Sequence, residues 1–208
     1  MTTTIPELRK HLRKARRRIS RFQQRKSAQQ VLNLFRLRLN PQFKSAKKIG
    51  LYLDAFGEIH TRLLIEYCFA QGKLVYLPVI CNMNQHLVWV RITPHQYRNK
   101  RFSHHGLGMR EPLQHRGVHV SKLDLLIMPL LACDDRGTRI GMGGGYYDRT
   151  LATAYKKPYR LGLAHDLQVV EKTLPRESWD QPLDALLTPT RLLRFKRYYG
   201  HPDVPRSF

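Results

Sequence analysis

Residues 134–149 read DDRGTRIGMGGGYYDR, and the rest of the sequence is organised around this stretch. Four glycines fall within five positions, after an apolar run at 123–133 and before a segment at 147–155 that has the residues of a short helix. A strand, a glycine loop and a helix in this order let backbone N–H groups and a helix N-terminus face an anion. The stretch therefore predicts a phosphate-binding loop.

Outside this loop, strand-like and helix-like patterns alternate. The predicted strands are 48–56, 73–80, 86–92, 123–133, 160–164 and 183–187, and a predicted helix at 61–71 ends at Gly72. The central strands are apolar throughout, which favours a mainly parallel sheet covered by helices on both faces. We expect one three-layer α/β domain at residues 1–196. Residues 197–208 are expected to form a disordered C-terminal tail.

Positive charge is concentrated at the N-terminus. The chain carries 37 Lys and Arg against 15 Asp and Glu, and 15 of these cations lie in residues 1–48, where Glu7 is the single acid. Residues 5–39 are predicted to form a basic helix, with a second segment beginning at Ser20 and an end at Asn40 and Pro41. Residues 93–122 are expected to be irregular. Such a charge attracts polyanions of any kind, so composition does not choose a partner.

The remaining composition points to a cytoplasmic protein. The three cysteines are widely spaced and form no C-x-x-C pair, which is typical of reduced core residues. No apolar run of about 18 residues is present, so no membrane association is expected. We expect a monomer.

The glycine loop matches neither of two common nucleotide motifs. No Lys-Ser or Lys-Thr pair follows the glycines, as a Walker-type loop requires, and Tyr146 stands where a dinucleotide fingerprint needs glycine. A tight turn without a ligand is the structural alternative. Against it, four glycines have a large entropic cost, and they adjoin Arg139, Asp148 and Arg149, residue types that hold phosphate and a divalent cation.

The motif RIGMGGGYYDR resembles the signature of the 5-formyltetrahydrofolate cyclo-ligase family, also called methenyltetrahydrofolate synthetase, in its bacterial form. The resemblance extends to the basic N-terminal helix, GEIHT at 57–61, REP at 110–112 and LPRESWDQPLDALLTP at 174–189, in the family's order. It implies an ATP- and magnesium-dependent enzyme. The formyl oxygen of 5-formyltetrahydrofolate is phosphorylated, and ring closure then gives 5,10-methenyltetrahydrofolate with release of ADP and phosphate.

The same resemblance implies roles for individual residues. Glu58 is expected to hold the folate, with Leu53 lining its pocket, and Tyr146 to lie at the reacting centre where folate and nucleotide meet. Tyr146 and Arg139 are the expected catalytic residues. The expected nucleotide-binding residues are Arg9, Arg139, Ile140, Gly141, Met142, Gly143, Gly144, Gly145, Tyr146 and Tyr147.

Two carboxylates are the expected magnesium ligands, Asp148 and Asp180. Each has a structural alternative, since Asp148 suits a helix N-terminus and Asp180 a turn before Pro182. The chain also departs from the family at two positions. Ile5 stands where a lysine often precedes the arginine matched by Arg9, and Gly144 stands where some members carry lysine.

Two other function classes remain as alternatives. A basic nucleic-acid-binding protein without catalytic activity fits the N-terminal charge, but no recognised binding motif is present, so nucleic acid is an unfavoured partner. An enzyme acting on a sugar phosphate or a CoA ester fits the scaffold. It gives no reason for Glu58 and Asp180 beside this loop. No histidine is assigned to catalysis.

Overall fold

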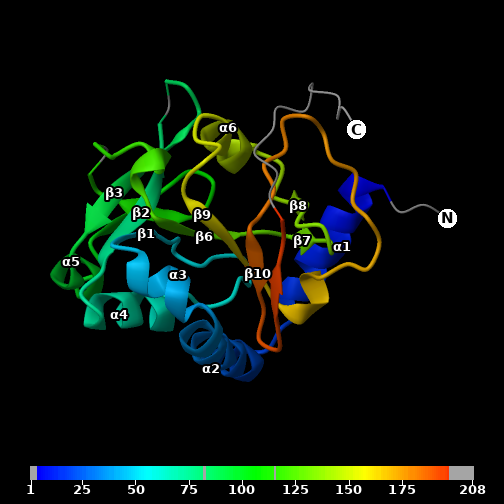
Figure 1. Cartoon of the computed structure of the whole chain (residues 1–208), viewed down its shortest axis with the longest axis horizontal. Coiled ribbons are helices and arrows are strands. Elements are labelled where there is room, and N and C mark those ends of the chain that lie inside the picture. Colours follow the sequence, from blue (N-terminus) through cyan, green and yellow to red (C-terminus); the bar gives the residue numbers. More distant parts are fainter. Residues whose placement is uncertain (1–3, 82, 115, 197–208) are drawn as a thin grey trace.

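The computed structural model describes residues 4–81, 83–114 and 116–196. Its centre is a sheet with the strand order β11-β10-β9-β6-β1-β2-β3 (Figure 1). The five inner strands are parallel, and β3 and β11 pair antiparallel at the two edges. The strands are β1 (Lys48–Gly50), β2 (Leu74–Ile80), β3 (Leu87–Ile92), β6 (Leu125–Pro129), β9 (Tyr159–Leu163), β10 (Ala185–Leu187) and β11 (Leu192–Arg194). The predicted α/β class and mainly parallel sheet are confirmed.

Helices cover both faces of this sheet, as the uniformly apolar strands require. In β6, Leu125 and Ile127 face one core, whereas Leu126 and Met128 face the other. The first core is closed by α2 (Arg21–Arg38), α3 (Asn40–Ser45) and α4 (Arg62–Ala70), and the second by α6 (Tyr146–Ala152). None of the helices in the described ranges is both long and apolar enough to cross a membrane.

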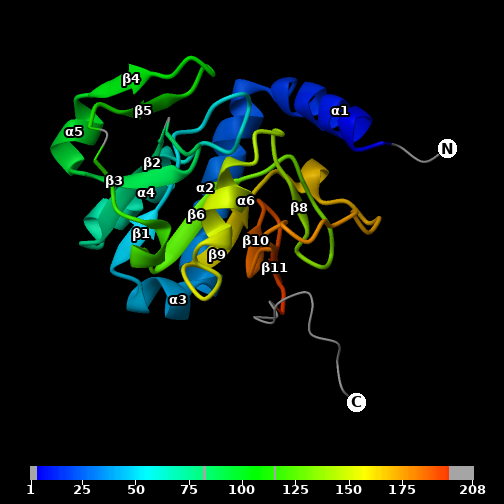
Figure 2. The same cartoon turned by 90° about the horizontal axis from the view of Figure 1, so that it is seen from above.

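The N-terminal helix α1 (Ile5–Arg17) lies away from the sheet. Thr4 caps it through a reciprocal pair of hydrogen bonds with Glu7, and Ser20 caps α2, so the predicted break between two basic helices is confirmed. Leu12 of α1 packs with Ala132 and Ile140, which belong to a small hairpin of β7 (Ala132–Cys133) and β8 (Arg139–Ile140). Figures 1 and 2 show α1 on the side of the molecule where this hairpin lies.

Two predicted strands are shorter in the structure. The run at 48–56 is a strand only to Gly50, because the Asp54 carboxylate then accepts hydrogen bonds from the N–H and hydroxyl of Thr61 and closes a loop. The run at 123–133 divides into β6 and β7, since Leu131 turns away to donate to Ile140. The glycine loop thus follows the hairpin and not, as predicted, a central strand.

Other differences concern the connections. Residues 93–122 contain α5 (Pro94–Arg98), the hairpin of β4 (Phe102–His104) and β5 (Arg110–Pro112), and a 3-10 turn, η1 (Val120–Lys122), where irregular structure was expected. Helix α2 ends at Arg38, just before Asn40 and Pro41, which begin α3. A second 3-10 turn, η2 (Asp166–Gln168), follows β9. The predicted tail at 197–208 lies outside the described residues.

Candidate active site

The sheet reverses its direction of growth between β1 and β6. From β1 the chain continues to β2 and β3 on one side, whereas β6, β9 and β10 follow one another on the other side. Open parallel sheets bind ligands beyond the carboxyl ends of their strands, at such a switch point. The segment after β1 carries Glu58, and the segment after β6 leads to the glycine loop. The two parts of the predicted site therefore meet at the same edge.

The glycine loop, Gly141–Gly145, uses backbone conformations that favour glycine at two positions. Gly143 has φ of +107° and Gly145, directly before α6, has φ of +65°. A Cβ atom at Gly141 would have Arg139 Nη1 as its nearest neighbour at 3.6 Å, and one at Gly143 would have the Arg9 guanidinium at 4.0 Å. A ligand can therefore approach the backbone here with a cation on each side.

Arg9 comes to this loop from α1. Its Nε donates to the carbonyl oxygen of Gly141 at 3.2 Å, across 132 positions of sequence. Ile5, at the position of the missing family lysine, instead packs against the apolar cluster beneath α1. Of these two positions, Arg9 is therefore the one that brings a charge to the loop.

Tyr146 folds back over the glycine loop. A Cβ atom at Gly144 would lie 2.6 Å from its ring, and the Arg149 guanidinium carbon lies 5.2 Å from the ring centroid. Arg149 Nη2 also donates to the Gly144 carbonyl at 2.7 Å. A side chain at Gly144, such as the lysine of some family members, would require the Tyr146 ring to move. Glycine and tyrosine are therefore matched at these positions.

Tyr147 faces inward from the same turn. Its ring lies 6.5 Å from that of Trp89, and the Arg139 guanidinium carbon lies 5.8 Å from its centroid. Burial, followed by the charge of Glu58, raises the pKa of the Tyr147 hydroxyl. Of the other predicted nucleotide-binding residues, Ile140 is buried and Met142 is exposed. Tyr147 thus joins the loop to the core beneath it and stays protonated.

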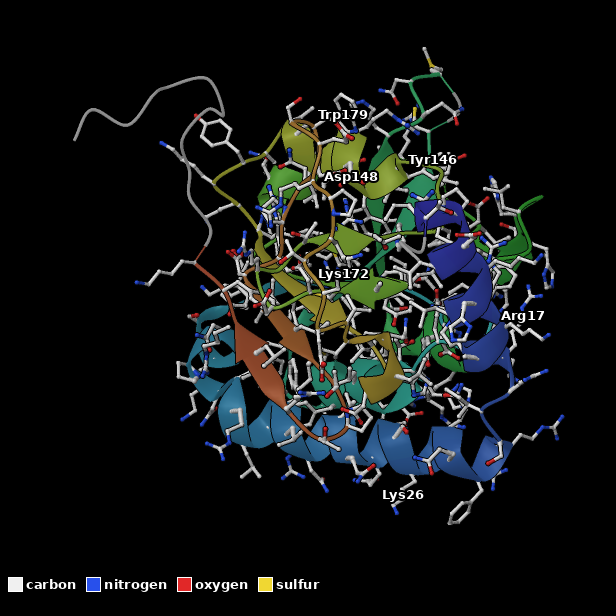
Figure 3. All side chains as sticks on the ribbon, turned by 90° about the vertical axis from the view of Figure 1, so that its right-hand side faces the viewer. Arg17, Lys26, Tyr146, Asp148, Lys172 and Trp179 are labelled. Carbon is white, nitrogen blue, oxygen red and sulfur yellow. The ribbon has the colours of Figure 1, made fainter. Side chains whose placement is uncertain are left out.

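Arg139 and Asp148 form an ion pair at the base of the loop. Arg139 Nη2 lies 2.6 Å from Asp148 Oδ1, and the side chain of Arg139 is buried. The backbone N–H of Gln181 donates to the same oxygen at 3.1 Å. Figure 3 shows Asp148 at the end of the molecule that also holds Tyr146 and Trp179. The structure thus brings the segment around Asp180 to Asp148.

The Asp180 carboxylate itself caps a turn, accepting the N–H of Glu177 at 2.9 Å. Within the described ranges, no group of three or more His, Cys, Asp or Glu side chains is placed to hold a metal. Magnesium is often bound by one or two carboxylates, waters and substrate phosphates, so Asp148 beside the glycine loop fits it. The hydrogen bond of Asp180 fits its structural alternative, the capping of a turn before Pro182.

Glu58 lies in a turn that its own side chain closes. Its Oε2 accepts the N–H of Ala55 at 3.0 Å, and its Oε1 lies 3.6 Å from Arg16 Nη2. The side chain is 10% exposed, and this burial raises the pKa of Glu58 to about 7 even though Arg16 lowers it. Leu53, the other predicted folate residue, is buried in the core beneath. The site thus holds a carboxylate that titrates near neutral pH.

The sequence did not single out several polar residues that surround Glu58. Arg16 was one cation among many in a basic helix, and His165 one of ten histidines, yet both are buried here. Tyr52 is also buried, and its hydroxyl has no hydrogen-bond partner among the described residues. Burial and the charges of Glu58 and Asp54 raise the pKa of Tyr52 well above its ordinary value. A polar residue within an apolar run was the available signal for Tyr52.

The chain has the fold of an open α/β enzyme, with a glycine loop at the switch point, an arrangement that is typical of enzymes that bind phosphate-bearing ligands. The model of the 5-formyltetrahydrofolate cyclo-ligase family matches residues 2–189. The chain therefore belongs to this family of ATP-dependent ligases, which convert 5-formyltetrahydrofolate to 5,10-methenyltetrahydrofolate. The predicted enzyme class is confirmed.

The chain is similar to individual members of the family over most of their length. The chain is 39% identical to the 5-formyltetrahydrofolate cyclo-ligase of Escherichia coli (strain K12), over 87% of this chain and 98% of the relative. The identity to the Haemophilus influenzae enzyme of the same name is also 39%, over 87% and 95%. The NMR structure of Aquifex aeolicus 5,10-methenyltetrahydrofolate synthetase superposes with a TM-score of 0.76 at 30% identity, over 98% and 95% of the two chains.

Proposed function

We propose that the described site carries out the family's reaction by holding ATP at the glycine loop and the folate at Glu58. One observation carries this proposal. Arg9 of α1 contacts the Gly141 carbonyl, and Arg16 of the same helix contacts the Glu58 carboxylate. The proposed ATP site and the proposed folate site thus share one wall, helix α1. Two substrates held by this wall would meet at the switch point between β1 and β6.

The reaction asks mainly for positioning and charge neutralisation. The formyl oxygen attacks the γ-phosphorus and the bond to the β-phosphate oxygen breaks, so ADP leaves. The neighbouring substrate nitrogen then attacks the formyl carbon, loses its proton and expels phosphate with the formyl oxygen. Phosphoryl transfer of this kind needs cations and N–H donors around the phosphate and no nucleophilic side chain. Arg9, Arg139 and the open backbone at Gly141 and Gly143 supply them.

Asp148, with Asp180 as a second candidate, would hold the magnesium ion, which neutralises phosphate charge when bound. Tyr146 lies over the loop, where it would exclude water from the transferring phosphoryl group. The Glu58 carboxylate would accept hydrogen bonds from the N–H groups of the pterin ring, which fix the ring's orientation. Arg139 holds Asp148 in place before either substrate binds.

A continuous absorbance assay for methenyltetrahydrofolate tests this function. Purified protein with 5-formyltetrahydrofolate, ATP and magnesium should form product, and omission of ATP or magnesium should each abolish it. Folded protein that forms no ATP-dependent product would reject the proposal. We further infer that the chain acts as a monomeric, single-domain cytoplasmic enzyme, which size-exclusion chromatography and cell fractionation would examine.

A further inference from the structure

The turn that carries Glu58 has an unusual backbone. Phe56 and Gly57 both have positive φ, at +51° and +79°. This conformation is costly for phenylalanine, so surrounding contacts must maintain it. A Cβ atom at Gly57 would lie 2.7 Å from the carbonyl oxygen of Arg16, which shows how closely the turn is pressed against the end of α1. The residues that hold this turn therefore decide where the Glu58 carboxylate points.

Three buried side chains from three separate elements hold the turn by its carbonyl oxygens. Arg16 Nε of α1 donates to Phe56 O at 3.1 Å, and Gln24 Nε2 of α2 donates to Gly57 O at 2.8 Å. His165, which precedes η2, places its Nε2 at 3.2 Å from the same Gly57 oxygen. Each of the three donors is at most 5% exposed. Side chains so buried form fixed hydrogen bonds and not transient surface contacts.

The histidine has a defined proton. A carbonyl oxygen only accepts hydrogen bonds, so Nε2 of His165 must carry the hydrogen. Burial lowers the pKa of His165 to about 4, and the imidazole is therefore neutral at physiological pH. His165 acts as a fixed donor and not as a proton-transfer group.

Arg16 has a second function in the same cluster. Its Nη1 donates to the Leu130 carbonyl at 3.0 Å, and its Nη2 lies 3.6 Å from Glu58 Oε1. One guanidinium thus contacts the segment after β1, the segment after β6 and the carboxylate itself. Buried ion pairs are often replaced by apolar residues without loss of stability, so stability alone does not explain this arrangement.

We propose that Arg16, Gln24 and His165 are positioning residues that fix the 55–58 turn and so aim the Glu58 carboxylate at the folate. This inference rests on the proposed role of Glu58 in folate binding. None of the three needs to touch the substrate. Their loss should weaken folate binding and leave ATP binding at the glycine loop nearly unchanged, because displacement of one binding group by a fraction of an ångström is enough to lose affinity.

The effect of Arg16 on the pKa of Glu58 distinguishes it from Gln24 and His165. The ionisable groups that influence the pKa of Glu58 or are influenced by it are Arg16 of α1, Tyr52 and Asp54 of the same loop, and Tyr147 of α6. Arg16 is the positive charge of this set, and it lowers a pKa that burial raises to about 7. Removal of Arg16 should therefore move the acid limb of kcat/KM for the folate to higher pH, whereas loss of Gln24 or His165 should leave that limb in place.

The kinetic experiment compares Gln24→Met, His165→Phe, Arg16→Gln and Arg16→Lys with wild-type enzyme. Each lost hydrogen bond should raise the KM for 5-formyltetrahydrofolate about three- to tenfold, with the KM for ATP within about twofold of wild type. Arg16→Gln should also shift the pH profile, and Arg16→Lys should restore the profile. The matched controls are Lys14→Gln, an exposed cation of α1, and Gln23→Met, an exposed neighbour in α2. Folate KM values equal to those of the controls, or equal rises for both substrates, would overturn the proposal.

A second measurement needs no turnover. Hydrogen exchange of the amides at 55–61 should be faster in Gln24→Met and His165→Phe than in Gln23→Met, because the turn opens more often. Exchange at control rates in both variants would show that they do not hold the turn. These neutral variants also decide the question if Arg16→Gln does not fold. Wild-type protein without cyclo-ligase activity would refute the proposed function, whereas unchanged exchange would refute the positioning role.

Discussion

Arg139 Nη2 lies 2.6 Å from Asp148 Oδ1, and the same oxygen accepts the Gln181 N–H at 3.1 Å. One carboxylate oxygen therefore joins the start of the glycine loop, helix α6 and the segment that contains Asp180. An amide oxygen can accept the same two hydrogen bonds, but it carries no charge. Substitution of Asp148 by asparagine thus separates its structural contribution from its proposed metal-binding role.

We expect Asp148→Asn to lower cyclo-ligase activity at least about 100-fold and to raise the magnesium concentration that gives half-maximal activity. Magnesium titrations of the initial rate measure both quantities, and circular dichroism confirms the fold. Asp135→Asn, an exposed carboxylate before the same loop, is the control and should behave as wild type. Full activity with an unchanged magnesium requirement would remove Asp148 from the metal site.

The backbone of the glycine loop gives a second prediction. Gly143→Ala places a side chain at φ of +107°, so it should lower the free energy of unfolding by about 1–2 kcal/mol and raise the KM for ATP severalfold. Gly72→Ala is a matched control, because Gly72 also has positive φ, at +66°, with open space around it and no part in the site. It should lose similar stability and keep its KM for ATP. Equal kinetics in the two variants would contradict the role of the loop.

The buried carboxylate gives a prediction for stability against pH. Glu58 has a pKa of about 7 in the folded chain against an ordinary value of 4.5, so the folded state binds its proton more tightly. Its contribution to stability is therefore lost as pH rises from 4.5 to 7. The free energy of unfolding of Glu58→Gln minus that of wild type should therefore increase by about 2–3 kcal/mol from pH 5 to pH 8.

Urea unfolding of both proteins at the two pH values measures this difference. His165, whose pKa is lowered to about 4, acts in the opposite direction, but it is present in both proteins and cancels in the comparison. A difference that is independent of pH would mean that Glu58 titrates at its ordinary value.

Most substitutions in a protein core lower the free energy of unfolding, but we do not expect this of a substitution that removes the unpartnered hydroxyl of Tyr52. Tyr52→Phe removes a buried polar atom that has no hydrogen-bond partner among the described residues, so the unfolding free energy should stay equal or rise by up to about 1 kcal/mol. Chemical denaturation without ligands is the measurement. A loss of more than about 1 kcal/mol would show that the hydroxyl is hydrogen-bonded in solution.

Much of the fold followed from the sequence because apolar burial leaves a direct trace there. The strands at 73–80 and 86–92 were predicted to within about one residue, and the parallel sheet followed from apolar runs that alternate with amphipathic helices. Ser20 marked the break between α1 and α2 because a side-chain oxygen at that position can cap a helix.

The rest depended on contacts that are distant in sequence. The strand after Lys48 stops at Gly50 because Asp54 pairs with Thr61, and the apolar run before the glycine loop divides because Leu131 pairs with Ile140. The local residue pattern is the same with or without those partners. The positions of Arg16 and His165 could not be predicted for the same reason, since buried polar residues leave no periodic signal. Glu58 was singled out through the family resemblance, whereas the glycine loop was singled out by its four glycines and the charged residues beside them.

Arg9 and Arg16 are seven residues apart in α1, which is close to two full turns, so their side chains leave one face of the helix. One contacts the glycine loop and the other contacts the turn of Glu58. Because α1 contacts both surfaces, a shift of this helix changes its contacts with both of them at once. For the two proposed substrate sites we therefore expect binding at one to alter binding at the other, and because such linkage is reciprocal, each substrate should change the dissociation constant of the other by the same factor.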